Sequence, residues 1–233
     1  MANTLLQNPA VATFASAVSS FTATFGSPCT PGSLIIAAVT GENRVSTFTV
    51  ADGANAGNYA ADVFVATASG VTGCGIAGIS SMQNTSSNAL TVTVTISGGA
   101  SIGTLKIYEI SGQATSSVLD SSGTQQWNGA QTVKTVPITT LTAHTTIIAA
   151  NYDYPGGAGV DTGFTSAFTE FGGTNGYHWG EYFIDSGAAN TYALEFNLTA
   201  GVDGCAQVAA AYKTSAGGGA SPILMGRQIF VLP

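Results

Sequence analysis

Residues 90–96 read Leu-Thr-Val-Thr-Val-Thr-Ile, and this stretch decides the fold class. Apolar and hydroxyl side chains alternate strictly along it, so each kind points to one face of an extended strand. We therefore predict a half-buried β-strand. A second strand is predicted at 104–110, because the residues between the two, Ser-Gly-Gly-Ala-Ser-Ile-Gly, have the composition of a turn.

The same short period continues along the chain, and no convincing 3.6-residue period interrupts it. Most boundaries between these segments carry Gly, Asn, Asp or Pro, which suit tight turns. About a dozen short strands at this spacing predict an all-β fold, a two-sheet antiparallel β-sandwich with jelly-roll or Greek-key connections. The further strands are expected at 11–25, 33–40, 45–51, 61–68, 75–83, 131–137, 144–151, 164–171, 177–185, 191–199 and 205–213.

Two parts of the chain echo each other weakly. Ser-Leu-Ile-Ile-Ala-Ala at 33–38 resembles Thr-Thr-Ile-Ile-Ala-Ala at 145–150, and the strand pair at 90–110 has a counterpart at 192–212. Two interpretations stay open: any two β-hairpins look alike, or two similar halves face each other in one sandwich. Since no linker separates the halves, a single domain is expected over 1–215.

The composition narrows the classes of function. Charged residues make up 7% of the chain, against about 25% in an average soluble protein. Only 5 residues are Lys or Arg and the net charge is −7, so no basic surface is available for nucleic acid or for anionic lipid. No segment is apolar for long enough to predict a transmembrane helix.

The first residues, Met-Ala-Asn-Thr-Leu-Leu-Gln, lack the basic region and the apolar run of a secretory signal. The expected location is therefore a virion, or the exterior of the cell after release. Cys29, Cys74 and Cys205 are an odd number of cysteines, and three small buried thiols are favoured over a bridge between Cys29 and Cys74.

A series of turn and strand motifs carries a resemblance to a known family. The series comprises Gly32–Val39, Phe48–Gly53, Gly57–Tyr59, Leu90–Val94, Ile107–Gly112 and Val118–Asp120, followed in the second half by Ile147–Ala150, Gly163–Thr165 and Cys205–Lys213. It is similar to a β-sandwich domain found in many bacterial extracellular and phage-encoded proteins, over about residues 10–213. Ala51 and Ala54 depart from the family's Asp-Gly-Asn hairpin and are expected to loosen it.

The resemblance implies a fold and no catalytic residues. The apolar C-terminal segment is a further departure from the family, and it looks like that of a virion or fibre protein that packs against copies of itself.

Candidates for catalysis are few. His144 and His178 are the possible bases at neutral pH, and no Gly-x-Ser-x-Gly elbow lies near His144. Among the acids, Glu181 pairs on paper with Glu170 or Asp185 as a sugar-cleaving pair. These side chains are expected to be structural, so the protein is not predicted to be an enzyme.

Aromatic residues are dense around 177–183. Alternation places Trp179 with Glu181 on one face of a strand, and His178 with Tyr182 on the other. One interpretation is a row that fills the core, and the other is a lectin-like site that binds surface glycans. The candidate binding residues are Tyr177, Trp179, Tyr182 and Trp127, the last expected in a loop.

Metal and modification sites are weakly indicated. The loop at 153–161 and the pair Asp52 and Asp62 offer oxygen ligands but lack the acidic run of a calcium site. No metal and no cofactor is predicted. Asn84 and Asn197 match the acceptor pattern for N-glycosylation, which arises often by chance in a Thr-rich chain.

The end of the chain differs from the rest. Residues 216–222 form a Gly-rich linker, and residues 223–233 are apolar and β-prone. Since such a segment is an aggregation hazard when exposed, it is expected to dock on its own domain or on a neighbouring subunit by strand addition. The candidate assembly residues are Ile223, Leu224, Met225, Ile229, Phe230, Val231 and Leu232.

Low charge and an apolar end together favour a structural protein that assembles with itself or with other virion proteins. A decoration, fibre or tail-associated protein of a phage is the expected function. A carbohydrate-binding module for cell-surface attachment is the alternative.

Overall fold

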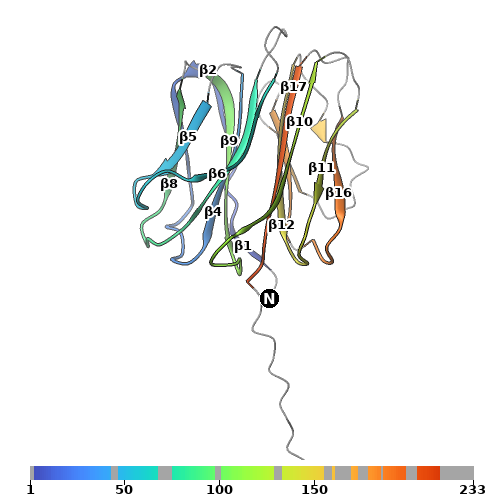
Figure 1. Ribbon diagram of the computed structural model, residues 1–233. Helices are drawn as coiled ribbons and strands as arrows, with labels where there is room; N and C mark the ends of the chain where they lie inside the picture. The colour runs from blue at the N-terminus through green and yellow to red at the C-terminus, as the bar shows by residue number, and fades with distance from the viewer. Residues whose placement is uncertain are drawn as a thin grey trace, which may run out of the picture.

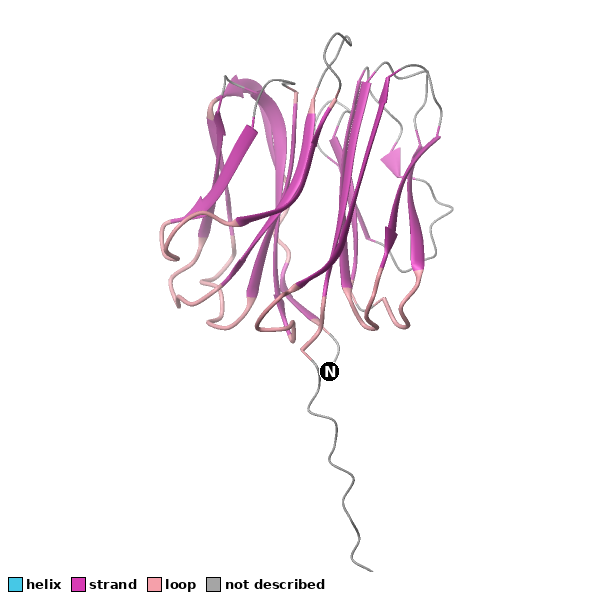
Figure 2. Cartoon of the chain, in the orientation of Figure 1, coloured by secondary structure: helices cyan, strands magenta, loops and turns pink. Residues whose placement is uncertain are grey.

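The computed structural model describes residues 3–42, 47–67, 75–97, 101–128, 133–154, 159–160, 169–172, 178–184, 186–197 and 204–215. The described residues form strands and no helix, so the prediction of an all-β, antiparallel fold is confirmed (Figure 2). The strands are β1 (Thr4–Gln7), β2 (Ala12–Val18), β3 (Ser20–Thr24), β4 (Leu34–Gly41), β5 (Thr47–Asp52), β6 (Ala60–Ala66), β7 (Ile76–Gln83), β8 (Thr91–Ser97), β9 (Ser101–Ser111), β10 (Leu119–Asn128), β11 (Val133–Thr139), β12 (Thr146–Tyr154), β13 (Gly159–Val160), β14 (Thr169–Gly172), β15 (His178–Phe183), β16 (Thr191–Asn197) and β17 (Gly204–Tyr212).

These strands form four sheets instead of the two that were expected. In the N-terminal half, the first inner sheet has the order β1-β9-β4-β7-β6, with β2 also paired to β9, and the first outer sheet has the order β3-β8-β5. In the C-terminal half, the second inner sheet has the order β10-β17-β12-β15-β14, and the second outer sheet has the order β11-β16-β13.

The two halves have one topology. Numbering β2 to β9 and β10 to β17 each from one to eight gives the same order in both inner sheets, 1-8-3-6-5, and in both outer sheets, 2-7-4. The two segments that echo each other in sequence begin the third strand of their halves, β4 and β12. The internal echo is therefore a structural repeat, in which each half has its own pair of sheets.

Three apolar cores hold the four sheets in layers, which Figure 1 shows edge-on. The first core lies between the first outer and first inner sheets and includes Val94 and Ile107. The second joins the two inner sheets through side chains such as Ile36 and Val208. The third lies between the second inner and second outer sheets and includes Phe196. We call the contact between the two inner sheets the seam.

At the seam the inner sheets run in reversed lateral order. β6, at one edge of the first inner sheet, contacts β10 and β17, and at the other side Tyr108 of β9 meets Tyr182 of β15. The fifth strand of one half thus lies against the first strand of the other. This is the arrangement of an isologous dimer with a two-fold axis along the strands, here made within one chain.

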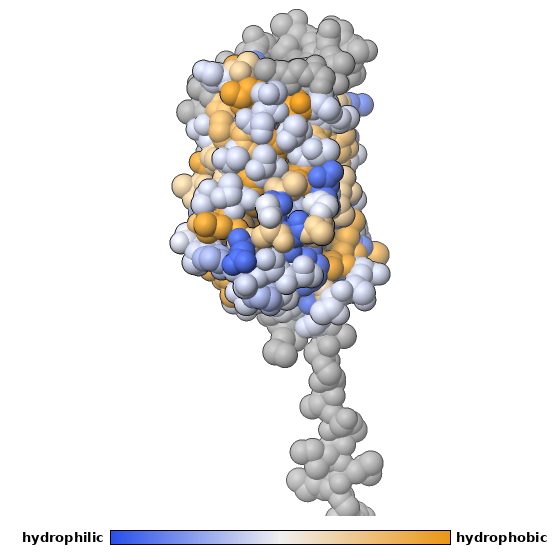
Figure 3. Space-filling view, turned by 90° about the vertical axis from the view of Figure 1, so that its left-hand side faces the viewer, coloured by the Kyte–Doolittle hydropathy of each residue, from blue (hydrophilic) through white to orange (hydrophobic). Residues whose placement is uncertain are grey.

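The outer face of the first outer sheet is covered by hydroxyl side chains. The exposed or half-exposed residues on it are Ser20, Thr22, Thr24, Thr47, Thr49, Thr91, Thr93, Thr95 and Ser97. Figure 3 views the molecule from this side, and pale residues of intermediate hydropathy cover much of it. Alternation explains the face, because the apolar residues of β3 and β8 point inward.

Two expected strands differ in detail from the structure. The stretch expected as one strand at 11–25 is divided into β2 and β3, which belong to different sheets. β1 and β10 were not expected. The linker at 216–222 and the apolar segment at 223–233 lie outside the described residues.

Candidate functional site

The aromatic residues on β15 divide between the faces of the second inner sheet. Tyr182 is half-buried in the seam, where its ring centroid lies 5.2 Å from that of Tyr108. Its hydroxyl accepts a hydrogen bond from Asn8 Nδ2 at 2.8 Å. Tyr182 therefore packs the two halves together. Tyr177 lies outside the described residues, and glycan binding by Trp179, which belongs to β15, stays a prediction.

Trp127 lies on a strand, which corrects the expectation of a loop. It is a residue of β10 and pairs with Cys205 of β17. The segment Leu119–Asn128 is rich in Ser, Gln and Gly and shows no apolar alternation, so its pattern gave no strand signal. Pairing with β17 along nearly the whole length of β10 supplies the missing stabilisation.

His178 is buried in the seam rather than presented to solvent. Its Nδ1 shares a hydrogen bond of 2.8 Å with Thr40 Oγ1, which in turn bonds Thr104 Oγ1 at 2.6 Å. Burial lowers the pKa of His178 to about 4, so the ring is neutral at physiological pH. This histidine joins β15 to β4 across the seam.

Lys106 is a second polar group of the seam that the sequence did not single out. It is 5% exposed, its Nζ donates a hydrogen bond to the carbonyl of Pro9, and the ammonium lies 5.7 Å from the ring centroid of Tyr108. Burial lowers the pKa of Lys106 to about 8. Alternation of Lys106 and Tyr108 in β9 was visible in the sequence, but burial of both faces of that strand was not.

The candidate acids do not form an open catalytic pair in the described part of the chain. Glu181 is 1% exposed, and its register partner on β14 is Glu170, whereas Asp185 lies outside the described residues. Within the described ranges no group of three or more His, Cys, Asp or Glu side chains could hold a metal ion. His144 is exposed in a turn, with a left-handed φ of 60°.

A buried polar cluster lies on the opposite face of the second inner sheet. Cys205 Sγ donates to Asn151 Oδ1 at 3.0 Å, and Asn151 Nδ2 donates to Asp153 Oδ1 at 3.3 Å. Asp153 is fully buried, and Asp161, its partner in the considered calcium loop, lies outside the described residues. Cys29 and Cys205 are both buried free thiols, while Cys74 lies outside the described part.

Asp52 organises the loop after β5. Its carboxylate accepts hydrogen bonds from the backbone of Ala54 and Asn55, from Asn55 Nδ2 and from the Tyr59 hydroxyl, at 2.6–2.9 Å. Burial alone would raise the pKa of Asp52, but these hydrogen bonds outweigh it and the pKa is lowered. Ala54 thus does not loosen the hairpin, because the contact uses its backbone.

The Asp52 loop also explains Asn84. This side chain is 1% exposed, accepts from Asn55 Nδ2 at 3.0 Å and donates to the carbonyl of Thr30 at 2.8 Å. A glycan cannot be attached to a buried, bonded amide of this kind. The acceptor pattern at Asn84 is therefore a chance match.

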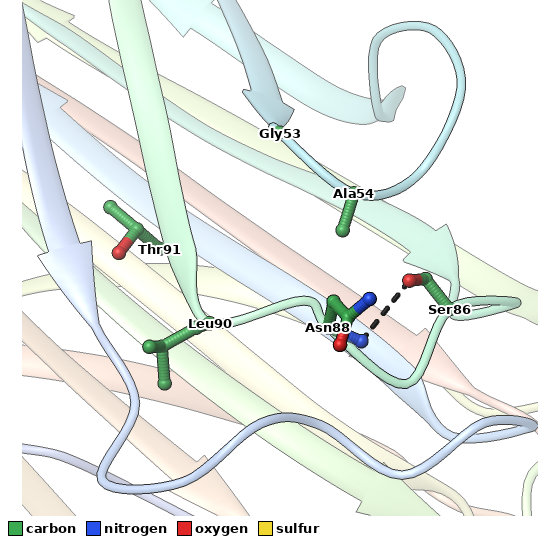
Figure 4. A pocket seen from close by; sticks show the side chains of 6 residues that line it. All are labelled: Gly53, Ala54, Ser86, Asn88, Leu90 and Thr91. Carbon is green, nitrogen blue, oxygen red and sulfur yellow. Dashed lines mark hydrogen bonds between the residues drawn. The ribbon is translucent and has the colours of Figure 1, made fainter.

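A shallow polar hollow of about 430 Å³ lies beside the same loop (Figure 4). Ser86 Oγ accepts a hydrogen bond from the backbone nitrogen of Asn88 at 3.1 Å. The lining residues are Gly53, Ala54, Ser86, Asn88, Leu90 and Thr91. None of these carries a charge or a titratable base, so this lining offers no acid–base chemistry.

A second hollow, which we call the seam groove, has a volume of about 380 Å³ and a mostly apolar lining. It lies where β6 and β7 of one half meet the start of β10 in the other. Its lining residues are Leu34, Asn58, Ala60, Asp62, Ser81, Met82, Gln83, Ser117, Val118 and Leu119.

Asp62 is the charged residue of this lining. The Tyr212 hydroxyl donates to Asp62 Oδ2 at 2.7 Å. Burial raises the pKa of Asp62, although hydrogen bonds from Ser81 and Tyr212 oppose the rise. A register shift between Ala61 and Val63 places Asp62 at a β-bulge. The position far from Asp52 excludes a shared metal site, and no feature of the sequence indicated the groove.

The described residues contain no helix long and apolar enough to cross a membrane. Comparison of the chain with protein-family models, with curated proteins and with solved structures finds no match.

Proposed function

We propose that this chain is a non-enzymatic structural protein that assembles with copies of itself, as a decoration, fibre or tail-associated component of a phage particle. The observation that carries the proposal is the four-layered stack, in which both inner sheets are buried on both faces. Such a stack is a stiff block, because closely packed interiors resist compression. Stiffness suits a building unit.

The placement of the titratable groups supports the same conclusion. His178, Lys106 and Glu181 are each at most 5% exposed, where they serve packing between strands and sheets. The outer face of the first outer sheet carries hydroxyls instead of charges. An uncharged face can be covered by a neighbour without the cost of removing water from ions.

We further propose that each half is a jelly roll. The strand orders 1-8-3-6 and 2-7-4 are those of the two jelly-roll sheets. The fifth strand departs from that scheme, since it pairs with the sixth strand at the edge of the inner sheet. The motif resemblance to β-sandwich domains of phage-encoded and extracellular proteins points to the same kind of unit.

Light scattering coupled to size-exclusion chromatography tests self-assembly directly. The full chain is expected to elute as an oligomer whose mass is a multiple of 23.3 kDa, and electron micrographs should show regular particles. A chain ending at Ser215 keeps all four described sheets and should assemble less well. A monomeric full chain at every concentration, or cleavage of a polysaccharide panel, would contradict the proposal.

A further inference from the structure

The last described residues of the chain run beside the seam groove. The backbone nitrogen of Lys213 donates to the carbonyl of Val118 at 2.8 Å, and that of Ser215 donates to the carbonyl of Gly112 at 2.7 Å. Val118 itself lines the groove. Residues 216–233 therefore leave the described structure within a few residues of this hollow.

The groove and the C-terminal segment are chemically complementary. Met82, Val118 and Leu119 are half-buried apolar side chains of the groove, and residues 223–233 are mostly apolar. Asp62 is the one charged residue in the lining described above, and Arg227 is the one charged residue among 216–233. An arginine paired with this carboxylate would compensate a charge that lies in apolar surroundings.

The groove also lies between two sheet edges. In the described part, β6 pairs with β7 alone and β10 pairs with β17 alone. Edge strands present backbone donors and acceptors to an added segment.

We propose that the seam groove binds residues 223–233 of a second copy of this chain, with Arg227 placed against Asp62. The inference rests on the self-assembly proposed above and names its acceptor site. Because the donor segment and the acceptor groove are neighbours on one molecule, two copies that face each other at this region can exchange their ends reciprocally. The seven residues 216–222 span up to about 25 Å when extended, which allows such an exchange. The result is a closed, self-complementary contact.

Charge reversal tests the pairing and its direction. Asp62→Arg and Arg227→Asp each place like charges together, so either variant alone is expected to lose most of the oligomer seen for the full wild-type chain. An equimolar mixture of the two variants should recover it, because each tail then meets a groove of opposite charge on the other chain. Light scattering measures the mass in all samples. Thr22→Arg, on the exposed hydroxyl face, adds the same charge elsewhere and should leave assembly unchanged.

Recovery in the mixture cannot come from a tail bound to its own chain. If the wild-type chain assembles and both variants assemble equally well, the groove is not the acceptor, while the proposed structural function stands. If the wild-type chain is monomeric, self-assembly itself has failed.

A cysteine pair keeps the test decisive where Asp62→Arg fails to fold, which circular dichroism would reveal. Ser117→Cys on one chain and Ile223→Cys on another should form a disulfide-linked dimer after mild oxidation of the mixture. Cys29 and Cys205 are buried and serve as the background in the wild-type chain. An internal crosslink in a monomer that carries both substitutions, with no linked dimer in the mixture, would place the segment on its own chain and overturn the proposal.

Discussion

Asp52 receives four hydrogen bonds from the loop that follows it, and it is the clearest case of one side chain that holds a local structure. Asp52→Ala leaves these donors without their acceptor, so the free energy of unfolding is expected to fall by about 2–3 kcal/mol. Urea denaturation measures the loss. Asp52→Asn keeps one carbonyl oxygen and should lose less, and an equal loss in both variants would contradict the role of the number of acceptors.

His178 makes stability depend on pH. Its pKa is about 4 in the folded chain against 6.5 unfolded, so between these values the unfolded chain binds a proton that the folded chain does not. The contribution of His178 is full above pH 6.5 and is lost as the pH falls towards 4, with a slope of up to about 1.4 kcal/mol per pH unit. His178→Asn should flatten the dependence of the unfolding free energy in this window. An unchanged slope would show that other groups cause it.

At the scale of single residues, sequence alternation predicted which side chains share a face but not what that face meets. His178 and Tyr182 do lie on one face of β15, and that face is the seam. No pattern within β15 could indicate a second sandwich behind it. Trp127 and Asn84 were misjudged for a similar reason, since their partners lie 78 and 29 residues away, on β17 and in the Asp52 loop.

At the scale of elements, close approach of strands sets strict limits on side-chain size. A Cβ added to Gly103 of β9 would lie 2.3 Å from the carbonyl oxygen of Thr40 on β4. Backbone cannot move away cheaply, so Gly103→Ala is expected to destabilise by about 2–4 kcal/mol. Gly53 has no atom within 4 Å of an added Cβ, and Gly53→Ala is the matched control. Thermal unfolding of both variants checks this, and equal melting temperatures would contradict it.

The strands were predictable to the degree that one of their faces meets solvent. β8 has a hydroxyl face and an apolar face, so its alternation is clear. β4 and β17 are buried on both faces, and their runs of Ile, Val and Ala show no alternation, as in other doubly covered strands. They were recognised by apolarity alone. β10 lacks both signals, and only pairing with β17 reveals it.

At the scale of the whole molecule, the seam should make the two halves unfold together. Ile36 of β4 is fully buried in the seam core, and Ile36→Ala is expected to cost about 2–5 kcal/mol. Both tryptophans, Trp127 and Trp179, belong to the C-terminal half. Tryptophan fluorescence should therefore report a lower denaturation midpoint although the substitution lies in the other half. An unchanged fluorescence midpoint would mean that the halves are independent.

The internal repeat was visible in the sequence, but its arrangement was not. The echo between 33–38 and 145–150 marks equivalent strands. A single sandwich and a stack of two produce the same short-range pattern, because both are built from strands of equal length and turns of equal composition. The choice between them depends on contacts between residues more than one hundred positions apart, such as Tyr108 with Tyr182.

The reversed order of the inner sheets places both partners of a dimer-like contact on one polypeptide. Dilution cannot separate them, so the seam forms at any protein concentration. The two sides are also released from identity with each other: a histidine can lie on β15 without a matching one on β7. One chain can in this way keep the strength of a symmetric pair while each of its outer surfaces evolves a separate task.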